Sequence, residues 1–155
     1  MISKCNNFSW FTFGARSHIT LNATEGEASI LVTRNGVYLL INNIELQRLK
    51  DLELPREIQG ELEIVEYDWF ERISAEKRAI DSIVKGKVIS DTGRYETGTV
   101  DLVSLRSVLS DYEVESYSDL GSECDEIFSD VVSLFTPEMT ELEVQGIMYR
   151  EMAKR

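Results

Sequence analysis

The residues with the clearest chemical character are the carboxylates of a long segment that contains no base. Residues 107–149 hold eleven aspartates and glutamates and no lysine, arginine or histidine. A helix over residues 119–135 would bring four of them onto one side: Asp119, Glu123, Glu126 and Asp130. They would form a row about 16 Å long, with one charge every ~5–6 Å, close to the spacing of successive phosphates along a nucleic-acid strand. Such a row could compete with nucleic acid for the basic groove of another protein and speed association with that protein.

These carboxylates could instead have a local role, with no partner involved. If Ser122 is the helix N-cap, Glu123 and Glu126 are first-turn acids that the helix dipole favours, and Asp119 leaves the row. Gly121 favours that later start. Solubility alone also favours negative charge, and metal binding is a third alternative. A merely solvated surface, however, does not predict 43 consecutive residues without a single base.

The rest of the chain offers little catalytic chemistry. His18 is the one histidine, and it has neither the partners nor the surrounding motif of a triad or a two-histidine metal site. Ser74 and Lys77 have the Ser-x-x-Lys spacing of some acyl-transfer enzymes, but the companion motifs are missing. Four carboxylates could gather a hard cation such as Mg²⁺: Glu61, Glu63, Glu66 and Asp68. Only Glu61 and Glu63 share a strand face, so we predict no metal site. Because the catalytic motifs are also missing, we predict no enzyme and no cofactor.

Composition limits the partners and the compartment. Residues 1–85 carry 10 bases and 13 acids (net −3), and residues 86–155 carry 6 and 15 (net −9). Direct binding of nucleic acid needs clustered lysine and arginine, so this charge excludes it. We find no signal peptide, and no apolar window approaches the roughly 20 residues of a membrane span. Cys5 and Cys124 have no metal or redox spacing, which predicts two reduced thiols in a cytoplasmic protein.

The pattern of the first half of the chain predicts an antiparallel sheet. Strands are predicted over residues 8–13, 18–21, 29–34, 37–41 and 61–65. The strongest local signal is Asn35-Gly36 between two apolar runs, which predicts a β-hairpin with a type I′ turn. A short helix is expected over residues 46–52, before Pro55.

The second half has helical periodicity. A helix over residues 67–85 has Trp69, Ile73 and Ile80 in its apolar stripe. Residues 87–99 could form a small hairpin or a mobile loop, and helices are expected over 101–112, over 118–135 and after Thr136, the predicted N-cap.

These observations predict a single α+β domain over residues 1–155. It is mainly β over 1–65 and mainly α over 66–155, with a sheet of four or five strands and helices packed on one face. The expected function is that of a small acidic, non-enzymatic protein that binds and inhibits or neutralises a basic protein partner, such as a nuclease or another nucleic-acid-handling complex. This includes anti-defence proteins, immunity proteins and nucleic-acid mimics. A homodimeric assembly module and a small enzyme with an unrecognised site are the alternatives.

Overall fold

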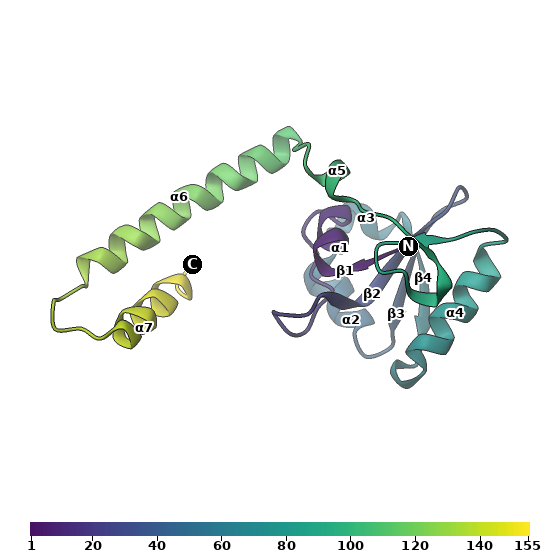
Figure 1. Cartoon of the computed structure of the whole chain (residues 1–155), viewed down its shortest axis with the longest axis horizontal. Helices are drawn as coiled ribbons and strands as arrows, with labels where there is room; N and C mark the ends of the chain where they lie inside the picture. The colour runs from purple at the N-terminus through teal and green to yellow at the C-terminus, as the bar shows by residue number, and fades with distance from the viewer. The chain divides into compact units, whose positions relative to one another are not determined.

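A computed structural model describes residues 1–155, which separate into two compact units, 1–106 and 107–155. The first unit contains a four-stranded sheet in the order β1-β2-β3-β4 (Figure 1). Its strands are β1 Ile2–Lys4, β2 Glu25–Val32, β3 Val37–Asn42 and β4 Leu62–Tyr67. The first three strands pair antiparallel and β4 runs parallel to β3. The predicted α+β class with a mainly antiparallel N-terminal sheet is confirmed, and the single domain stays a prediction.

The hairpin predicted around Asn35-Gly36 is confirmed, but its turn is different. Val32 pairs with Val37, which leaves a loop of four residues between the strands. Neither Asn35 nor Gly36 has a positive φ, as a type I′ turn would require. The Thr33 hydroxyl instead accepts hydrogen bonds from the backbone N–H groups of Asn35 and Gly36, at 3.1 and 3.2 Å. A side-chain hydroxyl therefore organises this loop.

The strand predicted over residues 8–13 is wrong, because Cys5–Phe11 form helix α1. Helical spacing places Phe8 and Phe11 on one side, where Phe8 is fully buried in the core. Aromatic residues favour strands only through the packing that a strand offers, and here the core offers it to a helix. Residues 18–21, the second predicted strand, form bends and a turn instead.

Helices cover both faces of the sheet, where the sequence predicted one (Figure 1). The connection from β3 to β4 carries α2 Leu46–Arg48, η1 Leu49–Glu53 and α3 Arg56–Gln59, and a parallel neighbour needs such a crossover. Leu49 and Leu54 of this connection pack with α1 on one face. The other face receives α4 Arg72–Ile83, which follows the short helix η2 Trp69–Glu71. Strand β3 is apolar on both sides for this reason.

Residues 87–99, predicted as a hairpin or a mobile loop, are anchored to the N-terminus of the chain. They contain a parallel pair, β5 Ile89–Ser90 and β6 Gly98–Thr99, with η3 Arg94–Glu96 between them. The N-terminal amine of Met1 donates to the Ile89 carbonyl at 2.7 Å. The buried Asp91 carboxylate accepts from the backbone N–H groups of Ser3 and Lys4 and from the Asn7 side chain, at 2.8–3.0 Å.

The second unit is a pair of helices, α6 Asp111–Ser133 and α7 Glu141–Met152, preceded at the end of the first unit by α5 Val103–Arg106. The helix boundaries predicted around residues 112–118 and at Thr136 are wrong. Ser110 and Thr140 are the N-caps, each in a capping box with the glutamate three residues later. Helix α6 therefore begins before residue 118, its predicted start, and before Ser122, its alternative cap, and the cap of α7 lies four residues after Thr136, its predicted cap.

Candidate functional site

The predicted acidic row lies in the middle of one continuous helix. All four carboxylates, Asp119, Glu123, Glu126 and Asp130, belong to α6 and are exposed. Gly121 does not interrupt the helix, so Asp119 stays in the row. Glu123 and Glu126 are not first-turn acids, because the first turn begins ten residues before Gly121 and contains Asp111 and Glu113.

An arginine from the end of the chain divides the row into two halves. The Arg155 guanidinium donates to Glu126 Oε2 at 2.6 Å and to Asp130 Oδ2 at 3.1 Å. Asp119 and Glu123 have no ion-pair partner in the unit. Exposed ion pairs of this kind contribute little to stability, so a cation of another molecule can exchange with Arg155 at small cost. The row therefore offers two free carboxylates and two exchangeable ones.

An uncovered apolar face runs beside the row on the same helix. Helix α7 packs on α6 (Figure 1), and Val131 is the one fully buried apolar residue of the unit. Four large side chains of α6 are each more than half exposed: Val114, Tyr117, Leu120 and Phe128. At 100° per residue they fall within about 120° of the helix circumference, next to the acidic row. These four side chains thus form an apolar surface with charge along its edge.

A second group of interacting side chains, which the sequence did not predict, surrounds a buried glutamate in the first unit. Glu76 of α4 is fully buried, and its carboxylate accepts hydrogen bonds from Tyr67 at 3.1 Å, from Ser29 at 3.4 Å and from Tyr95. Arg72 Nε and Arg94 Nη2 each lie 3.9 Å from it. Burial and then Glu76 raise the pKa of Tyr67. Burial and the hydrogen bond to Glu76 raise the pKa of Tyr95.

The Glu76 cluster is a buried structural cross-link. Its partners come from β2, β4, α4 and η3, so one carboxylate ties the 87–99 segment to the sheet and the helix. Tyr95 has a φ of 59°, a left-handed conformation that costs a non-glycine residue about 1–2 kcal/mol. The hydrogen bond from Tyr95 to Glu76 helps to hold that strained backbone.

A sequence signal for Glu76 existed. It stands seven residues after Trp69 and four before Ile80, in the middle of the apolar stripe predicted for this helix. In the structure, Trp69 and Ile73 are mostly exposed, while Ala75, Glu76 and Ile80 are buried. A charged residue in an apolar stripe predicts a buried, partnered group, and its partners were not adjacent in sequence.

Other chemical groups considered from the sequence include the carboxylates of residues 61–68 and the two cysteines. No group of three or more histidine, cysteine, aspartate or glutamate side chains is placed to hold a metal ion, and this includes the carboxylates of residues 61–68. Cys5 is half-buried and Cys124 exposed, and both are free thiols. None of the helices combines the length and the apolar character needed to cross a membrane.

Comparison with known proteins gives no relative. No family model, no curated protein and no solved structure matches the chain. The structure shows an α+β protein with a compact acidic helical unit over residues 107–155.

Proposed function

We propose that the chain is a non-enzymatic protein whose α6 helix binds, and thereby inhibits or neutralises, a basic protein partner such as a nuclease or another nucleic-acid-handling complex. The observation that carries the proposal is the acidic row beside an uncovered apolar face on one helix. Anti-defence proteins, immunity proteins and nucleic-acid mimics are the functional types that this chemistry suits. A cytoplasmic location accords with the two free thiols.

Charge supports a basic partner. Residues 107–155 carry 12 acids and 3 bases, a net charge of −9, against −3 for residues 1–106 with 16 acids and 13 bases. A concentrated negative field attracts a positive surface over about 8 Å at physiological salt and speeds encounter. Arg150 and Lys154 both pair with Glu151 and not with the carboxylates of the row.

The apolar face supports a specific complex rather than a purely electrostatic one. Buried aromatic and aliphatic anchors supply most of the affinity of protein interfaces, and peripheral charges mainly set rate and orientation. Tyr117, Leu120 and Phe128 can serve as such anchors, with Asp119 and Glu123 beside them. A second copy of the chain fits this face less well, because pairing two such helices would bring acidic rows together.

The first test is affinity capture from the native host, at low and at high salt, with two variants of equal charge. Asp119→Asn with Glu123→Gln removes the two unpaired carboxylates of the row. Glu57→Gln with Asp81→Asn, exposed positions in the first unit, removes two charges elsewhere. Each variant brings the net charge from −12 to −10.

We expect a captured basic protein whose association rate falls with salt and falls further for the row variant, with the control variant close to wild type. A third variant, Leu120→Ser, should raise the dissociation rate, because the anchor and not the steering charge is lost. A partner that binds the row variant and Leu120→Ser as it binds wild type would overturn the proposal. A dimer in light scattering that Leu120→Ser dissociates would favour the assembly alternative.

A further inference from the structure

Strand β4 forms an open edge of the sheet. The strand order β1-β2-β3-β4 leaves one side of Leu62–Tyr67 without a neighbouring strand. The Tyr67 carbonyl accepts from the Asn43 N–H at 2.8 Å, on the side of β3. The N–H and C=O groups of one strand residue point to the same side of the strand, and this side alternates from one residue to the next. Since Tyr67 points toward β3, the backbone groups of Leu62, Ile64 and Glu66 point outward, away from β3. Six backbone groups are thus free to pair with an added strand.

A groove follows this edge on the α4 side of the sheet. It has a volume of about 740 Å³ and lies between β4 and α4. Val65, Tyr67, Ala75 and Ala79 supply apolar lining, and Asp68, Glu71 and Arg78 are among its polar side chains. A strand laid along β4 would point every second side chain into this groove.

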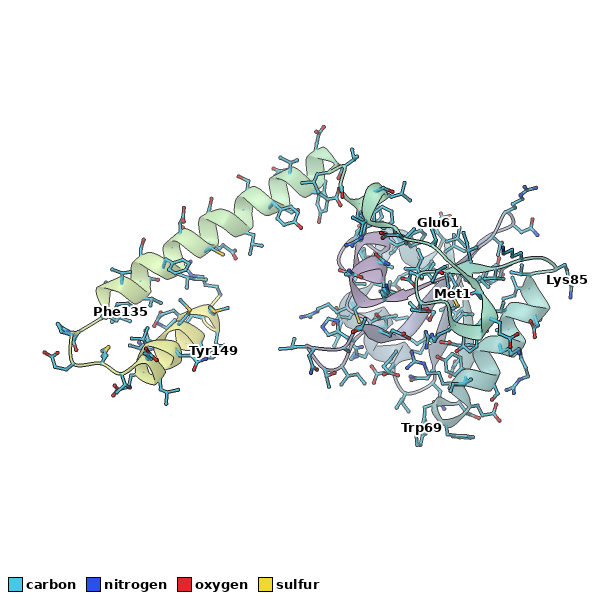
Figure 2. The ribbon with its side chains drawn as sticks, in the orientation of Figure 1. Met1, Glu61, Trp69, Lys85, Phe135 and Tyr149 are labelled. Atoms are coloured by element: carbon cyan, nitrogen blue, oxygen red, sulfur yellow. The ribbon has the colours of Figure 1, made fainter.

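Exposed aromatic side chains stand at one end of the groove. Trp69 and Phe70 lie in sequence between the groove residues Asp68 and Glu71, are mostly exposed, and contact each other edge to face with ring centroids 5.9 Å apart. Figure 2 shows Trp69 where the chain enters α4, at the opposite end of the helix from Lys85. A bound segment that leaves the edge at this end would meet both rings.

The charges along the edge select the occupant. Glu61, Glu63 and Glu66 are exposed and have no ion-pair partner, and Asp68 accepts only from the Asn43 amide at 3.0 Å. Edge glutamates keep a second copy from pairing with β4, since both strands would bring like charges face to face. The same glutamates attract an extended segment that carries lysine or arginine.

We propose that β4 accepts an extended segment of another protein, with alternating apolar and basic residues, as a fifth strand. Its apolar side chains enter the groove beside Val65 and Tyr67, and its basic side chains, on the opposite face, pair with Glu66. Backbone hydrogen bonds provide the affinity, and the alternate pockets provide the specificity. This surface belongs to the first unit and does not depend on the function proposed for α6.

The test uses the full chain and a seven-residue peptide of alternating lysine and valine, followed by amide hydrogen exchange in NMR spectra. We expect peptide binding to protect the N–H groups of Leu62, Ile64 and Glu66, while Glu63 and Val65, already bonded to β3, change little. The same peptide N-methylated on the residues that face β4 keeps its charge but cannot pair, so it should lose this protection. Strand addition would be refuted if the peptide protected all the β4 N–H groups alike and not every second one. Equal binding of the methylated peptide would also refute it.

Two substitutions separate backbone pairing from charge. Ile64→Pro removes one outward N–H and leaves the ladder to β3 intact, and it should weaken the peptide about two- to tenfold, the loss of one hydrogen bond. Ile64→Thr keeps the N–H and should bind as wild type, which controls for the altered side chain. Glu66→Lys reverses the charge on the face that the basic side chains occupy, so it should weaken binding sharply without changing the backbone; unchanged binding would overturn the choice of a basic occupant.

The α6 variant Asp119→Asn with Glu123→Gln should leave the alternating protection on β4 as it is in wild type. Loss of protection in that variant would show that the peptide acts through the acidic helix, and would overturn this inference while leaving the proposed function of α6 standing.

Discussion

Replacing Glu76 with alanine should destabilise the first unit more than any other single carboxylate change. The substitution leaves two tyrosine hydroxyls, from Tyr67 and Tyr95, without their buried acceptor. It also leaves Arg72 and Arg94 without the buried negative charge that lies 3.9 Å from each. Removing one partner of a buried charged network costs about 3–5 kcal/mol, a large part of the 5–15 kcal/mol that stabilises a typical domain.

Two further variants make the magnitude testable. Glu76→Gln keeps the shape but loses the charge and one of the two acceptor oxygens, so one tyrosine hydroxyl keeps an ordinary hydrogen bond and the other faces the amide NH2, at a cost of about 1–3 kcal/mol. Glu71→Gln removes the exposed carboxylate that pairs with Arg78, and this loss should cost at most about 1 kcal/mol. We therefore expect the order Glu76→Ala, Glu76→Gln, Glu71→Gln in loss of stability.

Urea unfolding followed by tryptophan fluorescence measures these differences in the correct unit. Both tryptophans, Trp10 and Trp69, lie in residues 1–106, so the signal reports on the first unit and not on the helices α6 and α7. The midpoint should shift while the slope stays constant, since the surface exposed on unfolding is similar. Equal midpoints for Glu76→Ala and Glu71→Gln would show that the buried cluster is not a stabilising cross-link.

Two further predictions concern pH and helix continuity. Burial and Glu76 raise the pKa of Tyr67 and Tyr95 in the folded state, so the unfolded chain loses these protons first as the pH rises. The free energy of unfolding should therefore be unaffected below about pH 10 and fall above it. Tyr95→Phe should make this fall shallower, which urea titrations at about pH 9, 10 and 11 would measure. Gly121 lies inside α6 with open space around its Cα; Gly121→Ala should stabilise the helix by up to about 1 kcal/mol and raise the thermal midpoint followed by circular dichroism at 222 nm, whereas no change would argue for a helix that starts at Ser122.

The parts of the fold that the sequence predicted correctly are those set by neighbouring residues. The β2–β3 hairpin follows from two apolar runs with turn residues between them, and the helical second half follows from a 3.6-residue period. The turn type was wrong because the Thr33 hydroxyl, which is outside the Asn-Gly pair, organises the loop. Local patterns thus predict an element more reliably than its geometry.

The parts that were missed depend on contacts between distant residues. Residues 8–13 have the composition of a strand, and only the shape of the core decides that Phe8 enters it from a helix. The parallel pairing of β4 with β3 has no local signature, because it requires the crossover between them. Arg94 and Tyr95 meet Glu76 across a separation of about 20 residues, and no spacing rule connects them.

The carboxylates of this chain serve three physical roles that a net charge cannot separate. Glu76 and Asp91 are buried and fully bonded, so they hold segments together and are not accessible to another molecule. Glu113 and Glu143 close capping boxes, which lowers the pKa of each and fixes a helix start.

The third role belongs to exposed carboxylates without an ion-pair partner, which include Asp119 and Glu123 on α6 and Glu63 and Glu66 on β4. Carboxylates of this kind can attract a basic molecule without first breaking an internal contact. Each pair also lies beside an uncovered apolar or backbone surface that can make the short-range contacts. A function argued from the charge of the chain therefore rests on these few residues, and variants of equal net charge at other positions are its proper controls.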